Sequence, residues 1–457
     1  MKIFLSFFCR VLLNRVVMSG WHLISLVLFI HLGPTSIAFA QIKTWDKTFG
    51  GNSYDFLTSV VSTSDGGYLL GGPSSSGKNG DKSEASRGPK GRVGEIMQDY
   101  WIVKTDNKGR KVWDKTFGGD REDILTAMVA MPDGGFLLGG YSRSNKSGDK
   151  SEASKSKKSY FDDYWLVRID ANGKRKWDKT FGGDGDDELY AIVATPDGGY
   201  MLGGLSASGK SGDKSESNRG DLDRLGYYSY DYWVIKIDAS GQKVWDKTLG
   251  GNHEDLLTSL LVTPDKGYLL SGTSNSEKSG DKSESKMGNW VIKLDATGKK
   301  EWEKTLGWGG NENDWNYKNV NALLNTPDGG YLLGTTASAG KKEDKSTSYA
   351  GYWIVKLNAQ GEKVWDKTYG GSFRDEFRTM IASPDGGYLL SGITNRGKAG
   401  DKSDDKKGYW IVKIKENPLN KYPPSGVGNK EVRFSYSFPP RVLSQIFFPL
   451  LSIFIIQ

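Results

Sequence analysis

Short apolar runs alternate along the chain with turns rich in glycine and aspartate, and this arrangement repeats. The string WDKTFGG returns in close variants, and a second string of the form YWIVK recurs in step with it. Self-similarity at a spacing of several tens of residues is typical of repeat architectures. The copies of the first string begin at Trp45, Trp113, Trp177, Trp245, Trp302 and Trp365.

Each repeat predicts four short strands, which we call a, b, c and d. In the first full copy they cover 57–63, 68–72, 100–104 and 111–117. Ser-Asp-Gly-Gly or Pro-Asp-Gly-Gly turns join a to b, and Asp-Asn-Lys-Gly and its variants join c to d. In such turns Asp bonds its own backbone and Gly takes the left-handed conformation. Strands b and c are almost continuously apolar, which indicates sheets covered on both faces.

Four-stranded antiparallel units set around a centre form a β-propeller, and a linear solenoid is the alternative. The chain opens with a lone strand d at 45–49, while its last copy, 377–415, has no strand d. The first strand would then complete the last blade. We therefore predict an all-β fold over 41–416, a six-bladed β-propeller of four-stranded antiparallel blades, closed by an N-terminal strand completing the last blade.

The N-terminal segment 1–40 predicts a secretory signal peptide. It carries Lys2, Arg10 and Arg15, then the apolar run LISLVLFI and the small residues AFA before Gln41. This order of charged, apolar and small residues is typical of a signal that is removed, and the apolar run is short for a membrane anchor. The only cysteine, Cys9, lies in this segment, so the mature chain would have no thiol.

The run DYWVIKIDASGQKVWDKTLGG and its copies resemble the bacterial secreted β-propeller repeat family, in the Trp-Asp-Lys-Thr version found in Bacteroidota. The resemblance implies the propeller fold and leaves the activity open. The segment from c to d is also similar to the tryptophan-docking repeat of quinoprotein-type propellers.

Many members of the family end in a sorting domain, and 417–440 resembles the opening of one. The tail 417–457 then becomes apolar, which favours a truncated or frame-shifted sorting domain over a membrane tail. The resemblance implies export machinery as a partner and a secreted or cell-surface location, or a periplasmic one if the tail is defective. We expect membrane contact only through the signal peptide or this tail.

Charge and residue types exclude several functions. The formal charge of +7 is spread over a chain of mixed signs, and loss of the signal lowers it, so we expect no nucleic-acid partner. With no cysteine and only His253 left in the mature chain, the usual nucleophilic and metal-hydrolytic constellations are missing. A glycosidase or lyase based on two carboxylates stays open.

Two aspartates each recur in five of the six repeats, which favours structural roles because a catalytic residue is normally needed once. The aspartate of GGxxxD and that of WDKT predict anchors for the crossing loop and its neighbours, because Asp readily caps backbone amides. The recurring GDKSE loop predicts a polar, self-capped turn, with calcium binding as the alternative. GGDGDDE offers the better calcium candidate, and no other cofactor is predicted; its carboxylates are Asp184, Asp186, Asp187 and Glu188.

Strand direction selects a working face. The a–b and c–d turns lie on one face, whereas the b–c loops and the d–a crossings lie on the other and are long and variable. We call the second face the long-loop face. It would carry aromatic residues outside the repeat pattern, which could stack on sugars, anchor a protein or merely pack the loops. These candidate ligand-binding residues are Tyr160, Phe161, Tyr227, Tyr228, Tyr230, Trp308 and Trp315.

The sequence thus favours a secreted or surface-displayed binding module over an enzyme, with a glycan or a protein as ligand. A carboxylate-dependent glycosidase or lyase, a quinoprotein relative and a purely structural surface spacer are the alternatives. The repeat tryptophans are expected to pack between blades.

Overall fold

The structure is a computed structural model of the 457-residue chain. It describes residues 46–88, 97–156, 158, 160–220, 222, 228–307, 322–337, 344–346, 350–370, 375–383, 387–394, 400–403 and 408–415. The predicted signal segment 1–40 and the predicted tail 417–457 lie outside the described residues. No helix in the described part is long and apolar enough to span a membrane.

The described strands form six small antiparallel sheets, each built from consecutive strands. The first three sheets are β1 (Ser59–Ser62), β2 (Tyr68–Ser74), β3 (Asp99–Thr105) and β4 (Lys111–Phe117); β5 (Asp123–Ala130), β6 (Phe136–Ser142), β7 (Asp163–Ile169) and β8 (Arg175–Phe181); β9 (Asp187–Ala194), β10 (Tyr200–Ser206), β11 (Asp231–Ile237) and β12 (Lys243–Leu249). The next three are β13 (Asp255–Val262), β14 (Tyr268–Ser274), β15 (Gly288–Leu294) and β16 (Lys300–Leu306); β17 (Ala322–Asn325), β18 (Tyr331–Ala337), β19 (Gly351–Leu357) and β20 (Lys363–Tyr369); β21 (Asp375–Ala382), β22 (Tyr388–Thr394) and β23 (Gly408–Ile414).

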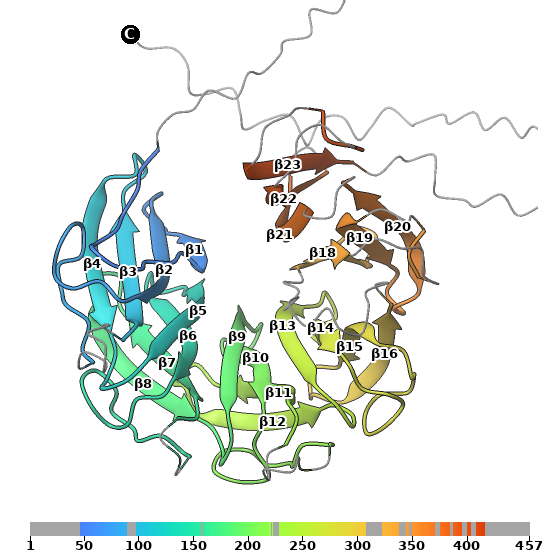
Figure 1. Cartoon of the computed structure of the whole chain (residues 1–457), viewed down its shortest axis with the longest axis horizontal. Coiled ribbons are helices and arrows are strands. Elements are labelled where there is room, and N and C mark those ends of the chain that lie inside the picture. The colour runs from blue at the N-terminus through green and yellow to red at the C-terminus, as the bar shows by residue number, and fades with distance from the viewer. Residues whose placement is uncertain are drawn as a thin grey trace, which may run out of the picture. The chain divides into compact units, whose positions relative to one another are not determined.

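The six sheets follow one another around a ring, which confirms the all-β, six-bladed β-propeller. The first strand of a blade, such as β5 or β9, lies nearest the centre, and the fourth, such as β8 or β12, lies at the rim (Figure 1). The last sheet has three described strands. Trp45 lies outside the described residues and residues 47–50 form no strand, so closure by an N-terminal strand stays a prediction.

The tight turns have the predicted chemistry. In the first a–b turn the Asp65 carboxylate accepts the Gly67 N–H, and Gly66 has a φ of 80°. In the first c–d turn Asp106 accepts the N–H groups of Lys108 and Arg110. Positive φ favours glycine because a Cβ is strained there. The fourth a–b turn, Pro-Asp-Lys-Gly, instead places Lys266 at a φ of 68°.

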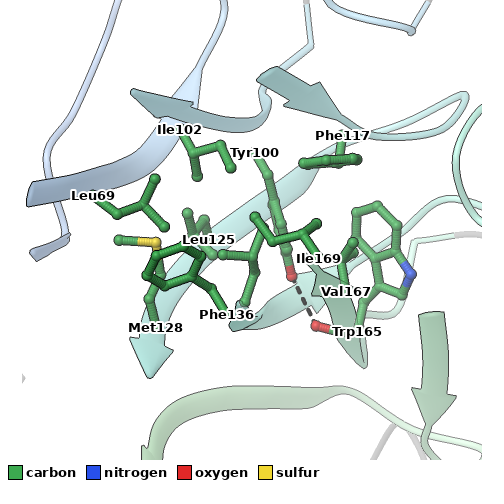
Figure 2. Packing of buried hydrophobic residues seen from close by; sticks show 11 residues of the cluster. Leu69, Tyr100, Ile102, Phe117, Leu125, Met128, Phe136, Trp165, Val167 and Ile169 are labelled. Carbon is green, nitrogen blue, oxygen red and sulfur yellow. Dashed lines mark hydrogen bonds between the residues drawn. The ribbon is translucent and has the colours of Figure 1, made fainter. Parts of the chain in front are cut away.

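The hydrophobic core lies between neighbouring sheets. Leu69, Tyr100 and Ile102 of the first sheet pack against Leu125 and Trp165 of the second (Figure 2). The tyrosine that precedes the strand-c tryptophan packs with its ring tilted against the strand-c tryptophan of the next sheet and donates its hydroxyl to that residue's carbonyl oxygen. The pairs are Tyr100 with Trp165, Tyr164 with Trp233, Tyr232 with Trp290, and Tyr352 with Trp410, at oxygen–oxygen distances of 3.0 to 3.1 Å.

A glycine in strand b makes room for each of these tyrosines. A Cβ at Gly204 would lie 2.7 Å from the Tyr164 hydroxyl oxygen and 2.0 Å from the Glu188 carbonyl oxygen. A Cβ at Gly140, Gly272 or Gly392 would likewise lie 2.6 to 2.9 Å from the hydroxyl oxygen of the corresponding tyrosine. We call this arrangement the tyrosine–glycine contact. It explains why strand b carries a glycine at its fifth residue although glycine is a weak strand former.

One interface departs from this pairing on both sides. The fourth blade has Asn289 in place of the tyrosine, and the fifth has Thr335 in place of the glycine, both fully buried. At this interface a smaller residue, Asn289, thus replaces the large tyrosine, and a larger residue, Thr335, replaces the glycine.

The WDKT tryptophans also lie between blades. The ring of Trp177 is covered by the c–d turn of the next blade, where a Cβ on Gly241 would lie 2.8 Å from the ring. Gly173 covers Trp113, Gly298 covers Trp245 and Gly361 covers Trp302 in the same way. The c–d turn glycine therefore serves both the turn and the interface.

Candidate functional site

The long-loop face is built by a repeated hydrogen-bond framework. The aspartate of GGxxxD accepts the N–H of the second glycine four residues earlier and a serine hydroxyl from the b–c loop. For Asp187 these donors are the Gly183 N–H at 2.7 Å and the Ser208 hydroxyl at 2.9 Å. The geometry matches the predicted anchoring of the crossing loop.

The GDKSE loop is not a self-capped turn, because its polar groups bind other segments. Its lysine is buried in all six copies, and Lys150 donates to Ser142 Oγ at 3.0 Å. Its aspartate accepts the N–H of the first glycine of the adjacent crossing, as Asp149 does from Gly118. A buried ammonium needs such acceptors, since burial without them is costly.

The same aspartate pairs with a basic residue from the preceding blade. Arg87 lies 2.9 Å from Asp149, and Arg219 lies 2.8 Å from Asp281. The remaining described pairs are Lys155 with Asp213 and Lys286 with Asp344. These ion pairs connect neighbouring blades at their loops.

The WDKT aspartate holds the loop to the sheet. Asp246 accepts the Ser215 N–H, the Trp233 indole N–H and the Lys243 ammonium. These donors lower the pKa of Asp246 against the effect of its burial. The residue is a structural anchor, as predicted for an aspartate that recurs in five of the six WDKT strings.

The predicted calcium carboxylates do not converge as a set. Asp187 serves the crossing loop, and Asp184 accepts the Gly209 N–H and the Ser211 hydroxyl. Asp186 and Glu188 instead meet Asp162, with carboxylate oxygens of all three within 4.8 Å of one another. Calcium binding here stays a prediction.

This group of Asp162, Asp186 and Glu188, the carboxylate cluster, lies between the second and third sheets. Arg143 donates to Asp162 at 3.1 Å, and the Tyr230 hydroxyl donates to Asp186 at 2.7 Å. Burial raises the pKa of Asp162 to about 8, opposed by Arg143 and reinforced by the two neighbouring carboxylates. Burial next to Asp186 also raises the pKa of Tyr230.

Sequence reasoning missed Asp162, because it stands in the b–c loop just before strand β7, in the sequence FDDYW. The doubled aspartate was the available signal. In the first and third blades a glutamine or a tyrosine takes its place, Gln98 and Tyr230. The residues that Asp162 contacts depend on how the second and third sheets pack, which the sequence around Asp162 does not report.

The predicted aromatic residues do not all gather in one place. Tyr160 and Phe161 stack edge to face at 4.7 Å, and Tyr160 is exposed. Tyr230 belongs to the carboxylate cluster, whereas Tyr228 is half-buried and lines a cavity. The predicted residues Tyr227, Trp308 and Trp315 lie outside the described residues.

The cavity at Tyr228 has a volume of about 820 Å³. Its walls come from the b–c loops of the second and third blades and from the crossing between them, so it opens on the long-loop face. The residues that line it include Lys155, Lys158, Asp184, Gly209, Lys210 and Tyr228. Cavities of this size are typical of small-ligand sites.

A second cavity, of about 540 Å³, lies on the opposite face between the fourth and fifth blades. Its lining combines Trp302 with turn residues of the repeat, such as Asp265 and Gln360. Because these residues serve turns and blade packing, this cavity is the weaker candidate.

Comparisons with known proteins were made for the whole chain. A search against protein-family models and a search of curated proteins both give no match. Among solved structures, a protein of unknown function from Dyadobacter fermentans is 10% identical, with a TM-score of 0.43, covering 80% of this chain and 97% of that chain.

Two further solved structures match with lower scores. The Pan2 WD40 domain of Neurospora crassa is 8% identical, with a TM-score of 0.41, covering 75% of this chain and 73% of that one. An apocarotenoid oxygenase mutant from Synechocystis is 11% identical, with a TM-score of 0.37, covering 68% and 60%. Similarity at this level supports no inference about ligand or activity, since propellers host unrelated functions.

Proposed function

We propose that the protein is a secreted or cell-surface binding module that takes a glycan in the cavity at Tyr228. The observation that carries the proposal is this cavity of about 820 Å³, walled by loops of two neighbouring blades. Polar loops held by a rigid scaffold are the usual place of binding sites.

The lining suits a sugar. Tyr228 provides an aromatic ring, and aromatic faces stack on the apolar face of a sugar ring. Asp184, Ser211 and Ser217 provide polar groups beside it, and apolar lining is limited to residues such as Ala207 and Leu222. Burial of one ring face among a few polar groups is a common design for small-ligand sites.

The cavity also stands apart from the repeat. Lys158, Leu222 and Tyr228 belong to stretches of the b–c loops that the other blades do not share. Loop residues that are not part of the repeat are better suited to a specific ligand than the packing residues that recur from blade to blade.

A glycan array read with the purified protein and with Tyr228→Ala tests this proposal. We expect the variant to lose at least about fivefold in affinity, because a stacked ring contributes on the order of 1 kcal/mol or more. Tyr160→Ala is the matched control, since Tyr160 is an exposed tyrosine of the neighbouring loop outside the cavity lining. Equal binding by the native protein and Tyr228→Ala would contradict the proposal, and absence of any ligand would favour a structural spacer.

The carboxylate cluster favours a second candidate, a carboxylate-dependent glycosidase. A raised pKa keeps Asp162 protonated near neutral pH, as a general acid requires. Its side chain is 1% exposed, however, and is paired with Arg143, so it lacks direct access to a substrate. Hydrolysis of an array-selected glycan that is lost in Asp162→Asn and Glu188→Gln would support this candidate over binding alone.

A further inference from the structure

We infer that the ligand of the Tyr228 cavity is an anionic glycan, with carboxylate or sulfate groups on its sugars. This inference rests on the proposed function and adds the chemical class of the ligand. It follows from the charges that line the cavity and from the partners those charges have.

Lysines dominate the charged lining. Lys155 and Lys158 come from the loop of the second blade, and Lys210 comes from the loop of the third, so lysines line the cavity from two sides. Asp184 is the only carboxylate among the described lining residues. The cavity therefore has a positive balance.

The single lining carboxylate is already occupied with the loop itself. Asp184 Oδ1 accepts the Gly209 N–H at 3.0 Å and the Ser211 hydroxyl at 2.7 Å. These bonds fix the loop that carries Lys210. Asp184 makes no ion pair with any of the described lysines.

The three lysines differ in how far they are neutralised. Lys155 lies 3.4 Å from Asp213 and 4.0 Å from Glu152. Lys158 lies over the ring of Phe161 at 5.5 Å. Lys210 is exposed, and within the described part of the chain its ammonium group has no carboxylate partner, so it is the best placed to bind an anionic group of a ligand.

Tyr228 places a sugar next to this charge. A Cβ on Gly209 would lie 3.1 Å from Tyr228 Cε2, so the ring packs against the backbone of the residue that precedes Lys210. A sugar on the ring would thus lie next to Lys210, which follows Gly209 and lines the same cavity. Lys is suited to carboxylates and sulfates as a compact point charge.

The chain offers a matched control in the fourth blade. Lys278 occupies the same place in its loop as Lys210, in NSEKSGDK against SASGKSGDK. The backbone N–H of each donates to the serine seven residues on, Ser285 and Ser217. Lys278 lines no part of the Tyr228 cavity.

Titration calorimetry with tetragalacturonate, its methyl ester and a sulfated oligosaccharide of equal length tests the inference. We expect at least one of the two anionic ligands to bind at least about tenfold more tightly than the neutral ester, with an affinity that falls as salt rises. Lys210→Gln should weaken the anionic ligand about tenfold, Lys210→Arg should retain binding, and Lys278→Gln should leave it unchanged.

The outcomes separate this inference from the proposed function. Binding of both anionic ligands no tighter than that of the neutral ester, or an unchanged affinity in Lys210→Gln, would overturn the anionic ligand while Tyr228-dependent glycan binding still stood. If the native protein binds no glycan, neutral or anionic, both the anionic-ligand inference and the proposed function are overturned. Preference for the sulfated or for the carboxylated ligand would each support the anionic class and identify its source.

Discussion

The tyrosine–glycine contact makes a quantitative prediction about what holds neighbouring blades together. Tyr164 is fully buried, and its hydroxyl donates to the Trp233 carbonyl oxygen of the next blade at 3.0 Å. Tyr164→Phe keeps the ring and its contact with the Trp233 indole but removes this bond. The free energy of unfolding should fall by about 1 kcal/mol, the net value of a buried hydrogen bond, and by up to about 2 if the carbonyl is left without a replacement partner.

Four such bonds act in four separate interfaces that share no partner residue. Replacing all four tyrosines by phenylalanine should therefore lower the free energy of unfolding by about 4 kcal/mol, since independent sites add. The tyrosines are Tyr100, Tyr164, Tyr232 and Tyr352.

Urea unfolding followed by tryptophan fluorescence measures both effects, because each tyrosine lies against a buried tryptophan. Tyr200→Phe is the control, since Tyr200 is 2% exposed and its hydroxyl makes no hydrogen bond with a described residue. If Tyr164→Phe is within about 0.3 kcal/mol of the native protein, or no worse than Tyr200→Phe, the reasoning is refuted.

Two further predictions concern a strained turn and a buried acid. Lys266→Gly should raise the free energy of unfolding by about 1 kcal/mol, because Lys266 has a φ of 68°, and Lys278→Gly should bring no such gain in the same urea titration. The pKa of Asp162 is raised from 3.8 to about 8, so the folded state holds a proton that the unfolded state has released. Its contribution to stability is present below about pH 4 and is lost as pH rises to about 8. Unfolding at pH 5 and pH 8 should show a smaller loss in Asp162→Asn than in the native protein, and an equal loss would contradict the assignment.

Strands and turns could be predicted closely because they depend on local sequence. The predicted strands 68–72, 100–104 and 111–117 match β2, β3 and β4 within two residues. The Asp and Gly turn positions were likewise correct, since a positive φ and an Asx hydrogen bond are decided within four residues.

The interior of the loops could not be predicted in the same way. The GDKSE loop is predicted as a polar, self-capped turn, yet its lysine is buried, and the Lys82 ammonium donates to the hydroxyls of Ser74, at the end of strand b, and Ser86, further along the same loop. Its recurrence in all six blades was the signal of a structural role.

The candidate site was predicted in part. Tyr228 and the long-loop face follow from strand direction and from departures of the loops from the repeat. The carboxylate cluster around Asp162 and the cavity shared by Lys210 and Tyr228 could not be predicted, because they depend on which loop segments meet in the folded protein. Sequence distance does not report such contacts.

The tyrosine–glycine contact also gives a blade a direction. The third blade, for example, offers Tyr232 to the fourth blade and Gly204 to Tyr164 of the second, so blades of this pattern join head to tail. A head-to-tail interface closes into a ring or propagates without end, depending only on the rotation between units. The contact that unites the blades within one chain would therefore, in an opened ring, link separate chains into a filament, whereas a ring closed as predicted would leave no such contact free for a second chain.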